Sequence, residues 1–189
     1  MKRSARLFPT LVLALAAVCA AQQPAAKAPQ HVDVPTIAPR AEDVATIDGI
    51  MKAFYDVISG PAGQARQWSR DRTLYIPDIR FVAMAENRNG KPVAHILSHQ
   101  QFVDASDAMV VKEGFYETEI HRVTQKFGNI AHVFSTYETR QKADGPVIGR
   151  GINSLELFYD GKRWWVASNI WDDARPDNPL AAEYLPAKK

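Results

Sequence analysis

The segment YETEIHRV, residues 116–123, carries the sharpest acid/base pair of the chain. Glu119 and His121 are two residues apart, and successive side chains of a strand alternate between its faces, so both would project from one face. A carboxyl group in an apolar site has a raised pKa and can transfer a proton near neutral pH. The pair is therefore a candidate for proton transfer. The alternative is that Glu117, Glu119 and His121 lie on a solvated outer face of a sheet.

The segment GKRWWVASNIWDD, residues 161–173, holds three of the four tryptophans. On a regular strand, Trp165, Asn169 and Trp171 share a face suited to a pocket wall, and Trp164 points to the opposite face, for packing. Asn153 lies on the preceding strand. A three-residue turn would pair it with Asn169, and a two-residue turn with the neighbouring serine. Two facing carboxamides would hydrogen-bond each other or a ligand, because buried amides need partners.

Other kinds of reactive site have no support in the sequence. The histidines are residues 31, 95, 99, 121 and 132, and none belongs to an H-E-x-x-H spacing. Cys19 is the only cysteine and lies within residues 1–21, the expected signal peptide, so a mature protein cleaved after it would have no thiolate metal ligand. No glycine-rich phosphate loop precedes a helix. The sequence therefore predicts neither a metal ion nor another cofactor.

The elements that must position these residues follow from hydrophobic periodicity. An apolar stripe with three- and four-residue steps predicts a helix over residues 41–60, and Pro61 can begin a second helix that ends at Arg70. Ser98 and Gln101 form a capping box that begins another helix. Strands are expected at residues 78–85, 92–97, 114–124, 130–140, 152–159 and 163–173. The order predicts an α+β fold, with helices on one face of a curved antiparallel sheet.

Three segments, residues 47–81, 128–140 and 152–173, carry a resemblance to a known family. They resemble the nuclear transport factor 2-like (NTF2-like) superfamily, which includes ketosteroid isomerase and SnoaL-like domains, and in particular its exported, uncharacterised bacterial members. The resemblance implies a cone-shaped curved antiparallel sheet, with N-terminal helices on its concave face and a pocket at its wide end. The superfamily contains isomerases, dehydratases, cyclases and binding modules, so the resemblance identifies a fold and no single reaction.

The resemblance also selects candidate pocket residues. Ala131, Val133, Ser135 and Tyr137 would face the concave side, and a turn near Phe127 would place Glu119 opposite Ser135 and His121 opposite Val133. Ketosteroid isomerases use a carboxylate base and a phenolic hydrogen-bond donor. Asp78 and Tyr55 are the candidates for these roles, although an aspartate after a proline is also ordinary turn chemistry. The expected pocket residues are Tyr55, Ser135, Tyr137, Asn153, Trp165, Asn169 and Trp171.

The chain begins with a basic stretch, an apolar run over residues 7–18, and small residues at 19–21. This order predicts a signal peptide, residues 1–21, and hence a periplasmic or secreted protein. The alternative, a membrane anchor, needs about 20 apolar residues. The whole chain has 23 basic and 21 acidic residues, and without the leader the two signs nearly balance. This balance argues against nucleic acid or a membrane as partner.

The remaining chain divides into three expected parts. Residues 22–40 are rich in proline and alanine and read as a disordered tether. Residues 41–177 would form the cone domain, and residues 178–189 a C-terminal arm. The last strand is apolar on both faces, so its outer face needs a cover. Either a homodimer forms through the outer sheet face, as the family resemblance suggests, or the arm covers that face within one chain.

Two functional hypotheses follow. The first is a non-catalytic protein, either with a pocket for a small, partly apolar molecule or as an interaction module. The second is an isomerase- or dehydratase-type enzyme with a carboxylate base in the cone, either Glu119 with His121, or Asp78. The sequence does not decide whether the protein is an enzyme.

Overall fold

The computed structural model describes residues 30–187, so the expected signal peptide and residues 22–29 lie outside the described part of the chain. Within that part the order of elements is helix, helix, helix, two strands, helix and four strands. The bounds are α1 Ala41–Val44, α2 Ile47–Asp56, α3 Trp68–Arg72, β1 Phe81–Glu86, β2 Pro92–Leu97, α4 His99–Glu113, β3 Tyr116–Phe127, β4 Ile130–Arg140, β5 Gly149–Tyr159, β6 Trp164–Asp173 and the 3₁₀ turn η1 Ala182–Tyr184.

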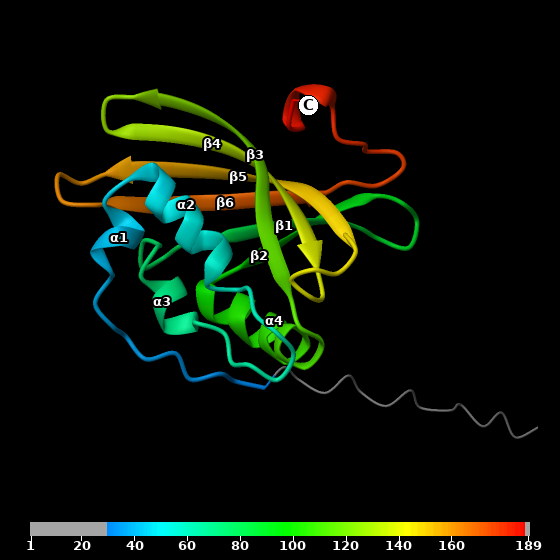
Figure 1. Cartoon of the computed structure of the whole chain (residues 1–189), viewed down its shortest axis with the longest axis horizontal. Helices are drawn as coiled ribbons and strands as arrows, with labels where there is room; N and C mark the ends of the chain where they lie inside the picture. Colours follow the sequence, from blue (N-terminus) through cyan, green and yellow to red (C-terminus); the bar gives the residue numbers. More distant parts are fainter. Residues whose placement is uncertain (1–29, 188–189) are drawn as a thin grey trace, which may run out of the picture.

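The six strands form one sheet in the order β2-β1-β6-β5-β4-β3. All neighbours are antiparallel except β1 and β6, which are parallel. The sheet is strongly curved, and α1 to α4 lie on its concave side (Figure 1). The expected α+β cone with helices on the concave face is therefore confirmed.

The helices differ from expectation in two places. The single helix expected over residues 41–60 is divided, because Thr46 is extended and its hydroxyl caps α2 by accepting from the Gly49 amide. The helix expected to begin at Pro61 begins only at Trp68. The intervening loop is held by the Arg66 guanidinium, which donates to several backbone carbonyls that no helix satisfies. The capping box that begins α4 is present as predicted.

One end of the cone, here called the closed end, is filled by apolar side chains. The concave faces of β4, β5 and β6 contribute the buried residues Ala131, Val133, Leu155, Leu157, Trp164 and Val166. Ile50 and Met51 of α2 pack against them and are almost fully buried. The concave assignment of Ala131, Val133, Ser135 and Tyr137 is confirmed, because all four are buried on the helix-covered side.

Two β-bulges interrupt the alternation of side chains. In β3, Glu119 pairs with Tyr137 and His121 with Thr136, so the intervening residue has no partner. In β6, Val166 pairs with Leu157 and Ser168 pairs with Glu156. Ala167 therefore has no partner and is the extra residue. A bulge places two residues opposite one and reverses which side chains face inward beyond it. Both bulges therefore redirect the candidate site residues.

The segment before α1 is anchored to α4. The Val32 amide donates to Asp104 Oδ1 at 2.9 Å, and Val34 is buried beside Trp68. The Arg72 guanidinium donates to the Val34 carbonyl at 2.9 Å. The expectation that all of residues 22–40 form a disordered tether is thus wrong for residues 31–34, whose valines supply apolar contacts that the surrounding proline and alanine residues concealed.

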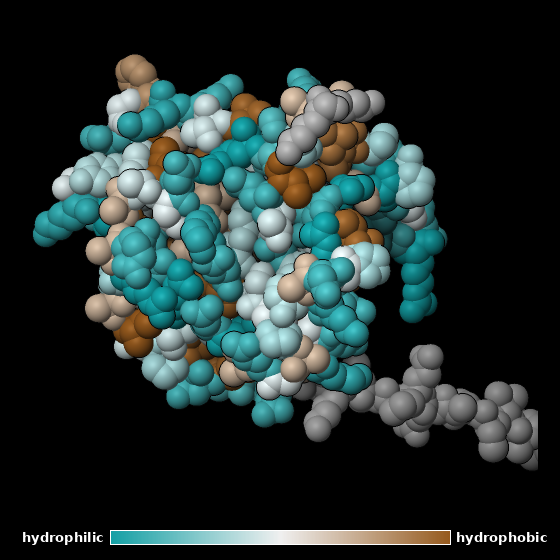
Figure 2. All heavy atoms as spheres, in the orientation of Figure 1, coloured by the Kyte–Doolittle hydropathy of each residue, from teal (hydrophilic) through white to brown (hydrophobic). Residues whose placement is uncertain are grey.

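The C-terminal arm lies over the outer face of the sheet. The Tyr184 carbonyl accepts from Thr136 Oγ1 at 2.7 Å, and the Tyr184 ring packs edge-on against Phe134, with 5.1 Å between centroids. Figure 2 shows hydrophobic side chains gathered beside this segment on a face that is otherwise mostly hydrophilic. The arm thus covers part of the outer face within a single chain, which is one of the two arrangements expected from the sequence.

Candidate functional site

A cavity of about 560 Å³ lies between the concave face of the sheet and the helices α2 and α4. We call it the cone cavity. It is lined by Phe54, Ile58, Asp71, Tyr75, Phe81, Phe102, Ser106, Met109, Val110, Phe115, Glu117, Tyr137, Thr139, Ile148, Gly149, Arg150, Asn153, Asn169, Trp171, Asp173 and Ala174. Its volume lies within the range of small-molecule sites, about 300–1,000 Å³.

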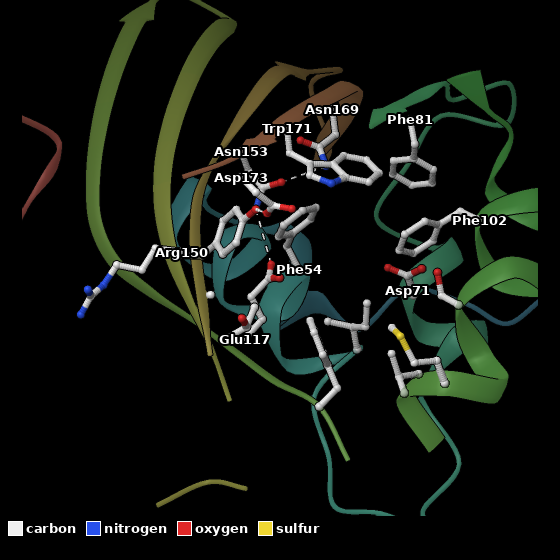
Figure 3. A pocket seen from close by; sticks show the side chains of 18 of the residues that line it. Phe54, Asp71, Phe81, Phe102, Glu117, Arg150, Asn153, Asn169, Trp171 and Asp173 are labelled. Carbon is white, nitrogen blue, oxygen red and sulfur yellow. Dashed lines mark hydrogen bonds between the residues drawn. The ribbon is translucent and has the colours of Figure 1, made fainter. Parts of the chain in front are cut away.

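Aromatic rings form much of the wall of the cone cavity (Figure 3). The centroids of Phe81 and Phe102 are 5.0 Å apart, and those of Phe102 and Trp171 are 6.0 Å apart. Met109 and Ile148 also line the cavity, and they are 53% and 58% exposed. The cavity thus has an apolar wall and exposed apolar residues at its entrance, which suits a partly apolar molecule.

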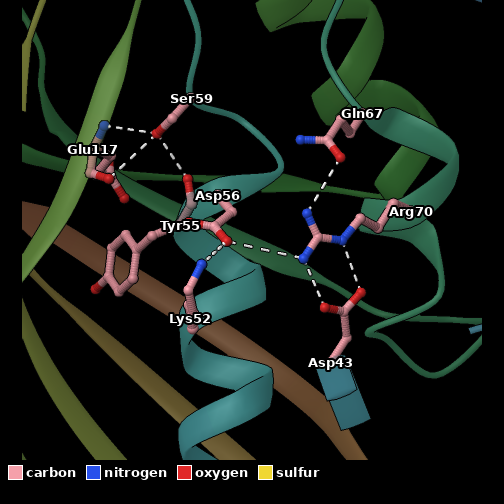
Figure 4. A network of polar contacts seen from close by, with 8 residues as sticks. All are labelled: Asp43, Lys52, Tyr55, Asp56, Ser59, Gln67, Arg70 and Glu117. Atoms are coloured by element: carbon pink, nitrogen blue, oxygen red, sulfur yellow. Dashed lines mark hydrogen bonds and ion pairs between the residues drawn. The ribbon is translucent and has the colours of Figure 1, made fainter. Parts of the chain in front are cut away.

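Glu117 is the most perturbed acid in the cavity. Burial raises its pKa to about 8, and the nearby carboxylate of Asp173 adds to the shift. Its backbone is fixed by Ser59, which follows α2 in the chain: the Glu117 amide donates to Ser59 Oγ at 3.0 Å, and Ser59 Oγ donates to the Tyr55 carbonyl at 2.7 Å (Figure 4). Near neutral pH, Glu117 is therefore a protonated carboxyl group held at a rigid position in the wall.

A chain of polar side chains leads from Glu117 through the core. Asn153 Nδ2 lies 3.5 Å from Glu117 Oε1 and 3.4 Å from the Tyr55 hydroxyl. The Tyr55 hydroxyl lies 2.6 Å from Ser135 Oγ, which donates to Glu119 Oε2 at 2.5 Å. Desolvation raises the pKa of Tyr55, so its phenol remains neutral. The chain fixes the Asn153 amide in the cavity wall and the Tyr55 phenol behind it.

Asn169 is a buried amide with an unsatisfied acceptor. Its Nδ2 donates to Asn153 Oδ1 at 3.3 Å, although the strand register pairs Asn153 with Trp171 and Leu155 with Asn169. Neither expected turn register is correct, since four residues connect Tyr159 to Trp164, but the expected contact between carboxamides forms diagonally. Asn169 Oδ1 accepts no hydrogen bond from any of residues 30–187.

Two further carboxylates line the cavity. The Tyr137 hydroxyl donates to Asp173 Oδ1 at 2.5 Å, and desolvation together with Asp173 raises the pKa of Tyr137. Asp71 is buried; it accepts from the Tyr75 hydroxyl at 2.9 Å, and His99 Nε2 lies 2.9 Å from its other oxygen. The cavity is therefore rich in hydrogen-bond acceptors.

The predicted acid/base pair is separated by the bulge in β3. Glu119 faces the concave side, where Arg122 Nε lies 3.0 Å from its Oε1, but Glu119 does not line the cone cavity. His121 pairs with Thr136, whose hydroxyl contacts the arm on the outer side, so it occupies the opposite face. The expectation that Glu119 and His121 share a face, opposite Ser135 and Val133, is wrong because the bulge reverses the alternation.

Two other candidates also lie away from the cavity. Asp78 is exposed in the turn before β1, as ordinary aspartate–proline turn chemistry predicts, and is not a pocket residue. Trp165 is on the outer side of the bulge in β6: its Nε1 donates to Asp160 Oδ2 at 2.8 Å, and Arg163 stacks 3.7 Å above its ring. The expected pocket role of Trp165 is wrong, and Trp164 packs in the core as predicted.

Of the remaining expected pocket residues, Tyr137, Asn153, Asn169 and Trp171 line the cone cavity. Tyr55 and Ser135 lie behind the wall and contact it through Asn153. Sequence reasoning did not select the residues Phe54, Asp71, Phe81, Phe102, Glu117 and Asp173. Glu117 was recognisable as one of three polar residues with alternating spacing in β3, but only the bulge decides which of the three face inward.

Within residues 30–187, no group of three or more histidine, cysteine or acidic side chains is arranged to hold a metal ion. No helix in this part of the chain has the length and apolar character needed to cross a bilayer.

Comparison with known proteins identifies the fold. A protein of unknown function with a cystatin-like fold from Nostoc punctiforme PCC 73102 superposes with a TM-score of 0.51 at 11% identity, covering 71% of this chain and 92% of that one. A protein described as the β subunit of an aromatic-ring-hydroxylating dioxygenase from Novosphingobium aromaticivorans DSM 12444 gives 0.52 at 17% identity, covering 69% and 90%. The chain has the cystatin-like α+β fold.

An NTF2-like protein of unknown function from Shewanella baltica OS155 also superposes, with a TM-score of 0.47 at 13% identity, covering 68% of this chain and 91% of that one. The fold expected from the sequence is confirmed as the cystatin-like α+β fold by the Nostoc punctiforme structure. No family profile and no curated protein matches the sequence significantly. A likeness of fold assigns no activity.

Proposed function

We propose that the protein binds a small, partly apolar molecule in the cone cavity. The observation that carries this proposal is the combination of a cavity of about 560 Å³, an aromatic wall and a few fixed polar groups. The closed end shows that the same sheet can be packed without a void, since Leu157 and Val166 are almost fully buried there. A void lined by Glu117 and Asn169 costs stability that binding a ligand would offset.

A cavity-filling pair of variants tests the proposal. Ser106 of α4 lines the cone cavity, whereas its neighbour Ala105 is exposed and does not. Ser106→Phe should fill the cavity, and Ala105→Phe adds the same ring to the surface. We expect fragments with one aromatic ring to shift NMR signals of cavity residues in the parent and in Ala105→Phe, but not in Ser106→Phe. The proposal fails if no fragment from a diverse set shifts the signals of Trp171 or Phe102 in the folded parent.

A second candidate function is proton transfer catalysed by Glu117. The specific observation is its pKa of about 8, which lets the group hold or release a proton near neutral pH. This version replaces Glu119, which was expected to act with His121, and Asp78 as the carboxylate base of an isomerase- or dehydratase-type enzyme. Small ketones incubated in D₂O would exchange their α-protons, and Glu117→Gln would abolish the exchange while Glu119→Gln would retain it. No exchange above the buffer rate with the parent protein would exclude this version for the ketones tested.

We further propose that the protein is exported and that it forms a homodimer. The basic, apolar and small-residue order of residues 1–21 supports a periplasmic or secreted protein. A homodimer through the outer sheet face would use its exposed apolar residues, such as Ile170, which is 44% exposed beside the arm. Light scattering after size-exclusion chromatography would measure the mass, and a monomer at micromolar concentration would exclude the dimer.

A further inference from the structure

The polar groups of the cone cavity are mostly acceptors with no partner of opposite charge. Glu117 and Asp173 lie near each other on the wall formed by β3 and β6, and neither forms an ion pair with any of residues 30–187. Arg150 is the only arginine or lysine in the lining. Its guanidinium bonds Glu138 at 2.6 and 2.9 Å and points away from the cavity (Figure 3). An anionic ligand would therefore meet like charge and find no cation.

The second observation concerns Asn169, in the same wall of the cavity, whose side-chain oxygen lacks a hydrogen-bond donor. Asn169 is 3% exposed, lines the cavity, and has an Oδ1 with no hydrogen-bond donor among the described residues. A buried acceptor without a partner carries a desolvation cost. The lining includes the rings of Trp171 and Phe102, and aromatic rings can attract a cation over their faces as well as supply apolar surface.

We propose that the ligand of the cone cavity is an organic cation, with an ammonium group beside Glu117 and Asp173 and an apolar or aromatic body against Phe54, Phe81, Phe102 and Trp171. This inference rests on the proposed binding function and adds the chemical class of the ligand. Three features select this class: carboxyl groups without an ion-pair partner among the described residues, the Asn169 acceptor without a donor, and aromatic walls. A neutral apolar molecule would leave Asn169 Oδ1 without a donor and Asp173 without an opposite charge.

The protonation of Glu117 couples binding to pH. The titratable groups that face Glu117 are Asp173 on β6, Tyr55 on α2, Tyr137 on β4 and Tyr75 after α3, and the three phenols remain neutral because burial raises the pKa of each. In the empty cavity Glu117 holds a proton at pH 7. A cation beside it favours the carboxylate. Binding of an amine at pH 7 should therefore release a proton.

Three probes with one skeleton test the inference: 4-phenylbutylamine, 4-phenylbutan-1-ol and 4-phenylbutyrate. NMR titration of the full chain at pH 7 should give an affinity at least about tenfold higher for the amine than for the alcohol, with the carboxylate weakest. Calorimetry in buffers of different ionisation enthalpy should show proton release with the amine alone. If the alcohol or the carboxylate binds as tightly as the amine, the cation inference is overturned and the binding proposal stands. If none of the three binds, the inference is overturned, and the binding proposal is then judged by the Ser106→Phe experiment.

Two neighbouring aspartates supply a matched control. Asp173→Asn removes one charge from the cavity and keeps an oxygen to accept from Tyr137. Asp172→Asn removes the same charge on the opposite face, where Asp172 lines the groove beneath the arm and pairs with Arg175. The tenfold preference for the amine should fall below about threefold in Asp173→Asn and persist in Asp172→Asn. An unchanged preference in Asp173→Asn would overturn the proposed position of the ammonium, and Glu117→Gln provides the same test if Asp173→Asn does not fold.

Discussion

The closed end and the cone cavity use the same face of the same three strands and differ in what covers it. At the closed end, Ile50 and Met51 of α2 fill the space against Leu157 and Val166. All four side chains are almost fully buried. At the cavity, the side chains that continue along β5 and β6 include Asn153 and Asn169, and the helices leave a void. The difference lies in the helical side of the interface and in a few polar residues on the sheet.

This contrast teaches how stability and binding are divided within one layer. Each side chain of the closed end is optimised for burial, so replacing it should destabilise the protein. Several cavity groups, such as protonated Glu117 and the unpartnered Asn169, are not optimal for the empty folded state. Replacing them should be tolerated or even stabilising, and should alter binding instead.

The largest effect is expected at the closed end. Leu157→Ala should lower the free energy of unfolding by about 2–5 kcal/mol, because it removes a buried side chain and leaves a void that the sheet cannot close. Met109→Ala at the cavity entrance, where the side chain is 53% exposed, should cost less than about 1 kcal/mol. Urea denaturation measures both. Equal losses would contradict the distinction between the two ends.

The next effect depends on pH and on Glu117. Its folded-state pKa, about 8, lies above the ordinary value of 4.5, so its contribution to stability is fully present below pH 4.5 and is lost as the pH rises through 8. Glu117→Gln should remove this loss. The variant should match the parent near pH 4 and exceed it by about 2 kcal/mol at pH 9, a value already reduced for solvent that enters the cavity.

Denaturation at several pH values measures the Glu117 effect, and Glu119→Gln is the matched control. Glu119 lies outside the cavity, beside Arg122, and its replacement should leave the slope between pH 5 and 8 unchanged. A parent protein whose stability is flat across this range would show that Glu117 is solvated.

A smaller effect is expected at Asn169. Asn169→Leu removes the unpartnered Oδ1 but also leaves Asn153 Oδ1 without its donor, so the change in the free energy of unfolding should stay within about 1 kcal/mol. Binding of 4-phenylbutylamine, followed by NMR titration, should weaken at least threefold because the wall loses an acceptor. A loss of stability as large as that of Leu157→Ala would assign Asn169 to the core.

The smallest effect is expected on the outer side of β6. Trp165→Phe removes the indole hydrogen bond to Asp160, which is exposed, and keeps a ring beneath Arg163, so thermal denaturation should show a cost of about 0.5 kcal/mol or less. Probe binding should be unchanged. Weakened binding in this variant would indicate that Trp165 lines the cavity, and would contradict its placement on the outer face by the bulge in β6.

The fold could be predicted from the sequence because its helices and strands have periodic patterns of apolar residues and local capping signals. The apolar stripe of α2, the capping box at Ser98 and the alternation in β4 are local patterns, and all three correspond to the structure. The concave face of β4 followed from its small and flat side chains. The site was only partly accessible: Asn153, Asn169, Tyr137 and Trp171 were found, and Trp165 and His121 were misplaced.

The misplaced residues share one physical cause. Both lie on strands interrupted by a bulge, and a bulge depends on packing between strands that leaves no clear local pattern. Phe81 and Phe102 were missed for a different reason, because an aromatic residue that lines a cavity has the same sequence pattern as one in a filled core. Only the shape of the void separates the two.

The extra residue at Ala167 has a consequence for how such a chain can change. Because it shifts the phase of β6, the half that ends at Val166 and the half that begins at Ser168 each present their own inward set of side chains. Loss of one codon at this point would exchange the inward and outward residues of one half without altering any other amino acid. The number of residues in β6, as much as their types, therefore decides whether Asn169 and Trp171 face the cavity or the solvent.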